Sequence, residues 1–423
     1  MTVNKTYELT RESGDRWLGQ IPAHWTTPGL AQIVRIKNGA DYKEVEATAG
    51  EGYPVIGSGG EFARATEYLY RGKSVLLGRK GTINKPLFVD EAFWTVDTMF
   101  YTDIGPMVDP RFFFYFCTRI DFGYYTTNTA LPSMASSDLK AIRVGLPPLE
   151  EQRQIAEYLD RETGKIDTLI AKQKQLVATL IERRRATIVQ AISRGADRDA
   201  SLVSSGVQWL GEIPAHWVIK RVRDSVRSTK GGVWGNDANE DSNDIWCVRV
   251  ADFDRLTLNV SKKKQTLRNV VGPERGGRIL ERGDLLLEKS GGGEKSPVGF
   301  VVLYDHDEPA VCSNFISRVR VADGQYPRFW LYVHAALYGT GLTGRSIKQT
   351  SGIQNLDQSS YFDESVAFPP LAEQIEIAAW LDVETQKMDA LMASSIKVAE
   401  LLSERRQALI SATVTGKIDG RGL

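Results

Sequence analysis

A pattern of apolar positions spaced by three and four residues occurs twice in this chain, at residues 146–195 and again at 368–417. The two copies align without a gap, and 21 of their 50 positions are identical. Unrelated segments of this length would share roughly three identities, so the chain contains an internal duplication. Each copy opens on Pro-Pro, continues with Glu-Gln, and carries Glu-Arg-Arg near its end.

The spacing within each copy predicts a helix with a narrow apolar stripe and charged flanks, as in a coiled coil. The Pro-Pro pair fixes the entry of the chain and allows a helix to begin just after it. The stripe in the first copy is expected at Ile166, Leu169, Gln173, Leu176 and Leu180. The stripe in the second copy is expected at Met388, Leu391, Ser395, Val398, Leu402 and Leu409.

Short apolar runs with glycine-rich turns lie before each helical copy and predict mixed α/β modules. In the first module the runs at 74–77, 86–89 and 99–101 suit strands. The aromatic-rich segment at 111–120 predicts one buried helix or strand, and residues 329–337 are its counterpart in the second module.

Each module follows a tryptophan-rich entry segment that is also duplicated. Residues 15–25 have the sequence DRWLGQIPAHW and residues 207–217 the sequence VQWLGEIPAHW, so eight of eleven positions match. The order of entry, module and helix therefore occurs twice. We call the segment between each entry and its helix module 1 (26–145) and module 2 (218–367).

This order predicts an α+β fold with two globular α/β domains, separated by an antiparallel two-helix coiled-coil spacer and related by a pseudo-twofold repeat. The predicted boundaries are 1–145 for the first domain, 146–195 for the first spacer helix, 196–367 for the linker and second domain, and 368–423 for the second helix and C-terminal tail. Thirty helical residues, from Lys165 to Arg194, would span about 45 Å. That length is a little more than one turn of B-DNA, which is about 34–36 Å.

Composition restricts the functions and the locations that the chain can have. The chain has 53 basic and 53 acidic residues, so a nucleic-acid site would have to be a local patch. The three cysteines lie far apart in sequence, which suits a reducing compartment. The polar N-terminus lacks the apolar core of a signal peptide, and no apolar run of about 18 residues predicts a membrane span. We therefore expect a cytoplasmic protein without membrane contact.

The doubled motifs resemble the specificity subunit of type I restriction-modification enzymes, the HsdS family. The resemblance rests on Trp17–Trp25 and its repeat Trp209–Trp217, together with Pro147–Gln152 and Pro369–Gln374, and its order of motifs covers essentially the whole chain. It implies that the modules are target recognition domains, each binding one half of a split, asymmetric duplex DNA sequence. It also implies that the helices set the distance between the halves and dock two adenine methyltransferase subunits, which a restriction subunit joins.

The sequence argues against catalysis by this chain itself. An adenine methyltransferase of the expected class needs an Asn/Asp-Pro-Pro-Tyr/Phe motif, but both Pro-Pro pairs here lie between apolar residues. Residues 339–344 match G-x-G-x-x-G by letter but follow a predicted helix, so a loop is the better interpretation. No Cys/His grouping has metal-ligand spacing, and His24 and His216 of the entries are interpreted as packed or capping residues. We therefore expect no cofactor on this chain, and the resemblance implies that S-adenosylmethionine, ATP and Mg²⁺ bind the partner subunits.

Candidate DNA contacts are cations, hydroxyls and amides in glycine-rich or polar loops of the two modules. An ordinary solvated turn is the alternative interpretation of each loop. The candidates in module 1 are Arg79, Lys80, Thr82, Asn84, Lys85, Thr127, Asn128 and Ser133. The candidates in module 2 are Lys230, Trp234, Lys289, Ser290, Lys295, Arg345, Lys348 and Gln349.

The matching charged segments near the helix ends are candidates for binding the methyltransferase subunits. They contain Arg183 and Arg184 in the first copy and Arg405 and Arg406 in the second. Charges beside a coiled coil more often act on register or solubility. A fused enzyme and a protein-only coiled-coil adaptor without sequence-selective DNA binding remain the alternative functions.

Overall fold

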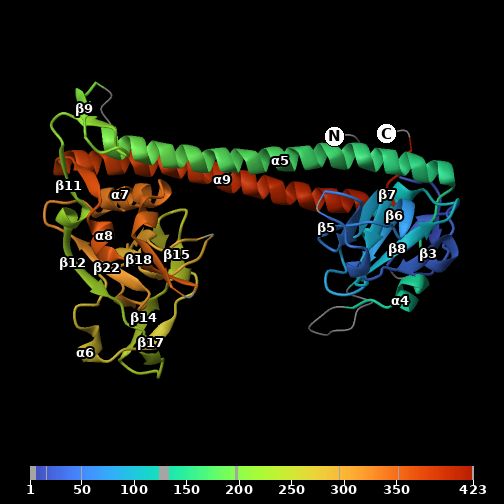
Figure 1. The fold of residues 1–423 in the computed structure, drawn as a ribbon, viewed down its shortest axis with the longest axis horizontal. Helices are drawn as coiled ribbons and strands as arrows, with labels where there is room; N and C mark the ends of the chain where they lie inside the picture. The colour runs from blue at the N-terminus through green and yellow to red at the C-terminus, as the bar shows by residue number, and fades with distance from the viewer. Residues whose placement is uncertain are drawn as a thin grey trace. The chain divides into compact units, whose positions relative to one another are not determined.

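The computed structural model describes residues 6–15, 17–48, 50–122, 133–195, 199–294, 296–350 and 352–421, and the chain forms two compact units. Unit 1 contains residues 1–173 and 397–423, and unit 2 contains residues 174–396. The two long helices α5 (Leu149–Arg194) and α9 (Leu371–Val414) begin directly after the Pro-Pro pairs, as predicted, and each contributes to both units (Figure 1).

Unit 1 is built around a six-stranded sheet with the order β3-β8-β6-β7-β4-β5. Neighbouring strands are antiparallel, except for the parallel pair β4 and β7. The three apolar runs predicted as strands lie in β6, β7 and β8. The strands are β3 (Val34–Asn38), β4 (Tyr53–Gly57), β5 (Gly60–Ala65), β6 (Tyr70–Gly78), β7 (Leu87–Thr95) and β8 (Met99–Ile104).

The aromatic-rich segment of unit 1 forms a helix, α2 (Pro110–Cys117), and not a strand. Asp109 caps it by accepting hydrogen bonds from the backbone of Arg111 and Phe112, and Pro110 occupies the first turn. Its buried rings pack in one core with Trp25, with Leu159 of α5 and with Ile410 of α9. The remaining elements of unit 1 are β1 (Thr10–Glu12), β2 (Gln20–Pro22), α1 (Leu30–Ile33), η1 (Lys43–Val45) and α4 (Ser136–Ala141).

Unit 2 has a main sheet with the order β12-β22-β18-β20-β16-β15. Its first four strands repeat the order and the antiparallel pairing of β3, β8, β6 and β7 in unit 1. The aromatic helix α7 (Pro327–Gly339) is buried at eight of its 13 residues and takes the place of α2. The strands are β12 (Val226–Gly231), β15 (Phe253–Asp254), β16 (Asn259–Val260), β18 (Leu285–Glu288), β20 (Val301–Leu303) and β22 (Ile316–Val321).

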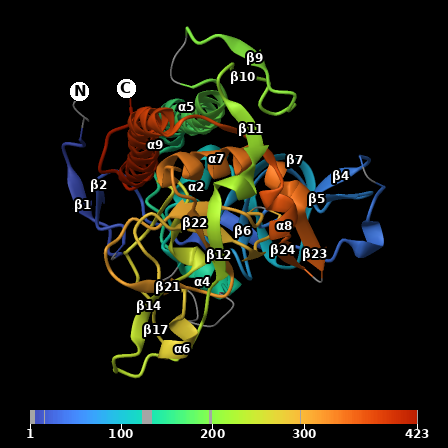
Figure 2. The same ribbon diagram turned by 90° about the vertical axis from the view of Figure 1, so that its left-hand side faces the viewer.

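Smaller sheets complete unit 2. The four-stranded sheet β13-β17-β14-β21 lies with α6 (Gly272–Arg275) toward the end of the unit away from α5 and α9 (Figures 1 and 2). Its strands are β13 (Asn236–Asp237), β14 (Asp244–Val248), β17 (Leu267–Asn269) and β21 (Ala310–Cys312). A three-stranded sheet consists of β19 (Ser290–Gly291), β24 (Ile353–Leu356) and β23 (Ile347–Thr350). The other elements are β9 (Leu202–Ser204), β10 (Glu212–Pro214), β11 (Val218–Arg221), η2 (Val222–Ser225), η3 (Val250–Asp252), η4 (Leu342–Ser346), α8 (Gln358–Phe362) and β25 (Ser365–Phe368).

The helices α5 and α9 run antiparallel in both units, as predicted. In unit 1, Asp167 of α5 pairs with Arg406 of α9, and Ile155 shares a core with Val414 near the end of α9. In unit 2, Leu180 packs with Met388 and Met392. The residue numbers of the contacts therefore increase along α5 while those of their partners decrease along α9, as in an antiparallel pair.

The predicted stripe was half wrong. Ile166, Leu180, Met388 and Ser395 are buried, but Leu169, Leu176, Leu391 and Val398 are between 38% and 55% exposed. At each exposed position the next residue along the chain is less exposed, so the less exposed positions have a spacing that starts with four residues and not three. On α5 the less exposed positions are Ile166, Ile170, Gln173, Val177, Leu180 and Arg184, and on α9 they are Met388, Met392, Ser395, Ala399, Leu402 and Arg406. Both registers have the same period, and apolar residues at both sets of positions made them indistinguishable from sequence.

Among the described residues, no helix is long and apolar enough to cross a membrane.

Candidate nucleic-acid interface

The duplicated entry segment attaches each module to its helix through a glutamate, which is buried in unit 1 and half-buried in unit 2. In unit 1, Glu151 near the start of α5 accepts hydrogen bonds from Trp25 Nε1 at 3.0 Å and Tyr7 Oη at 2.6 Å, and it contacts His24 Nε2 at 2.8 Å. Burial and the adjacent Glu151 carboxylate raise the pKa of Tyr7. In unit 2, Glu373 makes the equivalent contacts with Trp217 at 2.8 Å and His216 at 2.7 Å. Each entry histidine therefore has a carboxylate partner, but the two side chains are 43% and 54% exposed and are not packed in the core.

The next residue of each helix, a glutamine, holds the start of the aromatic helix. Gln152 accepts from the backbone N–H of Asp109 at 2.8 Å and donates to the Pro147 carbonyl at 2.8 Å. Gln374 accepts from the N–H of Tyr326 at 3.0 Å and donates to the Pro369 carbonyl at 2.9 Å. The Glu-Gln pair of each duplicated motif thus fixes two different segments of its module onto one helix.

A third repeated contact joins the aromatic helix to the long helix two turns further on. In unit 1, Asp160 accepts from Tyr115 Oη at 2.6 Å and forms an ion pair with Arg111. In unit 2, Asp382 accepts from Tyr332 Oη at 2.6 Å and from Arg328 Nε at 2.8 Å. These polar contacts explain why the two helical copies have the same residue, aspartate, at this position.

In module 1 five of the candidate DNA contacts, Arg79, Lys80, Thr82, Asn84 and Lys85, lie on the loop between β6 and β7. Lys80, Thr82, Asn84 and Lys85 are exposed there, as the prediction of a contact loop requires. Arg79 stacks over Phe100, with its guanidinium carbon 5.8 Å from the ring centroid. A side chain at Gly78 would collide with the backbone of Thr82, whose carbonyl oxygen would lie 2.4 Å from a Cβ. The loop is therefore folded tightly against the end of β6.

Lys80 and Ser133 are 53 residues apart in sequence, and the structure brings them together in an antiparallel β-bridge. Two segments proposed separately as DNA contacts thus form one surface. Thr127 and Asn128 from the same prediction lie outside the described residues, as does Lys295 in module 2.

In module 2 several candidates meet on the three-stranded sheet β19-β24-β23. Its central row consists of Ser290, Asn355 and Lys348, which lie opposite one another across the three strands. Ser290 donates from Oγ to Asn355 Oδ1 at 2.6 Å. Lys348 forms an ion pair of 2.7 Å with Asp357, and that contact lowers the pKa of Asp357. Gln349 is exposed on the outer strand of this sheet.

Lys230 and Lys289 place two further cations next to this sheet. Lys230 is exposed near the end of β12, and the Lys289 ammonium lies against the neighbouring Gly231, where an added Cβ would be 3.1 Å from Nζ. Because exposed ammonium groups attract phosphates, the end of β12 and the sheet β19-β24-β23 make a polar surface with local positive charge.

Trp234 belongs to a different part of module 2, next to the sheet β13-β17-β14-β21. Its ring is 40% exposed and is covered on one face by Arg268, whose guanidinium carbon is 4.5 Å from the ring centroid. Arg268 also forms an ion pair with Asp237. The structure therefore holds this cation in place beside an accessible aromatic ring.

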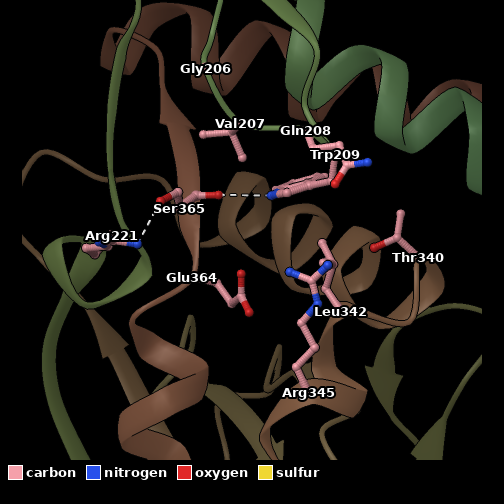
Figure 3. A pocket seen from close by; sticks show the side chains of 10 residues that line it. All are labelled: Gly206, Val207, Gln208, Trp209, Arg221, Thr340, Leu342, Arg345, Glu364 and Ser365. Carbon is pink, nitrogen blue, oxygen red and sulfur yellow. Dashed lines mark hydrogen bonds between the residues drawn. The ribbon is translucent and has the colours of Figure 1, made fainter.

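Arg345 lines a cavity of about 560 Å³ beside the entry segment of unit 2. Figure 3 shows its guanidinium and the Glu364 carboxylate lying in this space, beside Trp209 and Leu342. Trp209 donates from Nε1 to the Ser365 carbonyl at 3.0 Å, and Arg221 donates to Ser365 Oγ at 2.8 Å. Arg345 is thus associated with the entry segment, unlike Lys348 and Gln349 on the following strand.

The four arginines proposed for partner binding divide into two pairs. Arg183 and Arg405 are exposed. Arg184 and Arg406 are ion-paired with Asp389 and Asp167 on the other long helix, at 3.1 and 2.8 Å. The second pair therefore stabilises the contact between α5 and α9, and only the first pair offers free guanidinium groups in the described part of the helices.

Two exposed residues at the polar surface of module 2 escaped the sequence analysis. Asn355 lies at the centre of the three-stranded sheet, and Phe315 precedes β22 and is 45% exposed. The alternation of exposed and buried positions in residues 353–356 is a weak signal for a strand with one exposed face. Nothing in it distinguishes Asn355 from any other exposed strand residue.

No group of three or more His, Cys, Asp or Glu residues within the described segments could hold a metal ion. The three cysteines are buried and unpaired, and burial raises the pKa of the Cys247 thiol to about 12.

Comparisons with known proteins agree with this architecture. A family model described as the type I restriction modification DNA specificity domain matches residues 22–178. The chain is 24% identical over 314 residues to the type I restriction enzyme MjaVIII specificity subunit of Methanocaldococcus jannaschii, with 70% of this chain and 67% of that protein covered. It is 25% identical over 245 residues to the StySPI specificity subunit of Salmonella potsdam, with 57% of this chain and 50% of that protein covered.

The fold is also similar to that of a chain in a solved structure of the type I R-M system. The TM-score is 0.67 at 13% sequence identity, and the match covers 93% of this chain and 98% of that chain.

The chain thus has two α/β modules whose main sheets share the order of four strands, and each module is attached to the long helices. The sequence is similar to the HsdS-like specificity subunits of type I restriction-modification systems, the resemblance that its entry and Pro-Pro motifs indicated.

Proposed function

We propose that this chain recognises a bipartite, asymmetric duplex DNA sequence and docks two adenine-N6 methyltransferase subunits, through which a restriction subunit joins. The observation that carries the proposal is the repetition of one module with different loop residues. The main sheets of both modules share the order of four strands, and both modules have the same three polar attachments to a long helix, yet their loop residues differ. Two modules of one fold with different contact residues suit a target whose halves differ in sequence.

Each module supplies the groups that DNA recognition needs. Backbone phosphates are bound by cations, hydroxyls and N–H groups, and bases are distinguished by side chains that reach the groove edges. Module 1 offers Lys80, Lys85 and Asn84, and module 2 offers Lys230, Ser290 and Lys348. Because the whole chain is neutral, these local groups and not net charge would attract DNA.

The long helices supply a surface for the methyltransferase subunits. Leu169 and Leu391 are related by the duplication and are 45% and 55% exposed, and the equally related Leu176 and Val398 are 44% and 38% exposed. A helix that contacts only one partner needs two apolar positions per heptad, whereas these helices carry a third. The additional apolar column fits packing against helices of another subunit, and its presence in both copies offers two similar docking sites.

The direct test is to co-express the chain with its methyltransferase and map N6-methyladenine across the host DNA. A split motif with one modified adenine on each strand is the expected result. Exchange of residues 26–145 for another module should change one half of this motif and leave the other intact. Insertion of one helical turn into both long helices should alter the distance between the halves without changing their sequences.

The rival function is a protein-only adaptor, which would assemble with partners but show no sequence-selective retention of duplex DNA at raised salt. A stable complex that modifies no motif and binds all duplexes equally would favour that rival. In the proposed function, S-adenosylmethionine, ATP and Mg²⁺ act on the partner subunits.

A further inference from the structure

The ends of β6 and β18 carry the same backbone framework in the two modules. In module 1, the N–H groups of Arg79 and Lys80 both donate to the carbonyl of Thr98, at 2.8 and 3.2 Å. In module 2, the N–H groups of Lys289 and Ser290 both donate to the carbonyl of Phe315, at 2.9 and 3.3 Å. Arg79 therefore corresponds to Lys289, and Lys80 corresponds to Ser290.

A returning segment joins each strand end at the same position. The N–H of Met134 donates to the Arg79 carbonyl at 3.0 Å, and the N–H of Leu356 donates to the Lys289 carbonyl at 2.8 Å. Met134 and Leu356 also lie 222 residues apart, the offset that relates the two helical copies. One residue earlier on each returning segment, Ser133 lies opposite Lys80 and Asn355 lies opposite Ser290.

The equivalence extends to the neighbouring edge strand. Gly39 donates to the Met99 carbonyl at 3.0 Å after β3, and Gly232 donates to the Ile316 carbonyl at 2.9 Å after β12. A Cβ at either glycine would collide with the backbone of the adjacent segment, at 2.1 Å in both cases. The backbone therefore follows the same path around the two strand ends. Equivalent hydrogen bonds hold it there, and equivalent close contacts require glycine at the same position in both modules.

The side chains on this shared framework differ in their hydrogen-bonding chemistry. Module 1 has the cation Lys80 opposite the hydroxyl of Ser133, whereas module 2 has the hydroxyl of Ser290 opposite the amide of Asn355. Lys80 and Asn355 are exposed, and Ser133 and Ser290 are half-buried. A lysine contacts guanine O6 and N7, and an asparagine contacts adenine N6 and N7, so the two pairs would select different bases.

The orientation of Asn355 suits such a contact. Its Oδ1 atom accepts from Ser290 Oγ at 2.6 Å, which fixes the amide plane on the exposed face of a three-stranded sheet. The major groove admits a β-ribbon, and the exposed Phe315 beside Gly291 provides an apolar surface that could contact a thymine methyl group. Lys289 and Lys230 lie beside the same sheet, where they can bind the flanking phosphates.

We infer that these two equivalent pairs, Lys80 with Ser133 and Ser290 with Asn355, are specificity-determining residues, each pair contacting bases of one half of the target. The inference rests on the proposed bipartite recognition and adds the positions that distinguish one half from the other.

The test uses the full complex of this chain with its methyltransferase and maps N6-methyladenine in host DNA. Asn355→Ala and Ser290→Ala should relax or change one or two base positions in a single half of the motif, with a loss of discrimination of at least about tenfold. The double variant Lys80→Ser/Ser133→Asn, which gives module 1 the pair of module 2, should change the other half only. Asp323→Ala is the matched control, because this residue is 90% exposed and follows the opposite end of β22.

Copurification with the methyltransferase shows that each variant assembles, and Asn355→Asp supplies a second variant of nearly equal size. Variants that methylate the unchanged motif at wild-type frequency would overturn the inference. Uniformly weaker methylation of an unchanged motif would overturn it as well, because that result assigns these residues to phosphate binding. If the unmodified complex itself produced no split motif, the failure would belong to the proposed function and not to these positions.

Discussion

Arg184 of α5 donates from Nε to Asp389 of α9 at 3.1 Å, and the duplication repeats this ion pair as Arg406 with Asp167 at 2.8 Å. The two pairs differ in burial. The side chains of Arg184 and Asp389 are 13% and 18% exposed, whereas those of Arg406 and Asp167 are 31% and 51% exposed. Burial raises the pKa of Asp389 even with Arg184 beside it. The two copies of this ion pair should therefore contribute differently to the stability of the helix pair.

Removing Arg184 should destabilise the helix pair more than removing Arg406. Arg184→Ala leaves the Asp389 carboxylate largely buried without its cation and should cost about 2–4 kcal/mol, whereas Arg406→Ala should cost less than about 1 kcal/mol. Hydrogen exchange of the α9 amides around residues 389 and 406 measures each effect locally. The double variant Arg184→Leu/Asp389→Leu serves as the control, because it removes the unpaired charge and should recover most of the loss. Equal losses at the two sites would contradict the assigned difference in burial.

Replacing Glu151 by alanine should detach the entry segment from α5 in unit 1. Trp25 Nε1 and Tyr7 Oη would both lose their acceptor in a buried setting, at a cost of about 2–5 kcal/mol. Chemical unfolding followed by tryptophan fluorescence measures the change. The adjacent Glu150 is 72% exposed, so Glu150→Ala should change stability by no more than about 0.5 kcal/mol. The same loss in both variants would show that helix charge, and not the buried contact, is responsible.

Unit 2 should lose stability in acid because of His334 on the buried helix α7. Complete burial lowers the pKa of His334 to about 4 from 6.5. The unfolded chain therefore binds this proton at a higher pH than the folded chain, and stability falls by up to about 3 kcal/mol as the pH drops from 6.5 to 4. His334→Cys introduces the residue found at the corresponding position of α2, Cys117, and should flatten this dependence. An unchanged slope in unfolding experiments between pH 7 and pH 4.5 would assign the acid sensitivity to other groups.

A charge placed on the exposed apolar column should weaken methyltransferase binding without unfolding the chain. Leu391→Glu should reduce affinity at least tenfold, because the side chain is 55% exposed in the free subunit and would be buried in the proposed interface. Ala393→Glu adds the same charge two residues on, about 200° around the helix, and should leave binding near the wild-type level. Copurification or calorimetry with the methyltransferase gives both values. Normal binding by Leu391→Glu would place the methyltransferase elsewhere.

The sequence by itself determined the order of elements and the resemblance to type I specificity subunits. The identities between residues 146–195 and 368–417, together with the repeated entry, were enough to predict two modules, two long helices and their antiparallel pairing. These features depend on local composition and on a spacing of three and four residues that only a helix satisfies. The strands β6, β7 and β8 and the helix α7 followed from equally local signals.

Tertiary structure alone decided the details on which recognition depends. Leu169 and Ile170 are adjacent apolar residues, and only packing against α9 decided that Ile170 faces the helix and Leu169 faces outward. Glu151 and Glu150 are alike in sequence, yet one lies beneath Trp25 and the other at the surface. Lys80 meets Ser133, and Ser290 meets Asn355, only because strand pairing joins segments more than fifty residues apart. Local patterns determine the type of each element. Long-range contacts determine which side chains share a surface, and these contacts exist only in the folded chain and leave no local pattern in the sequence.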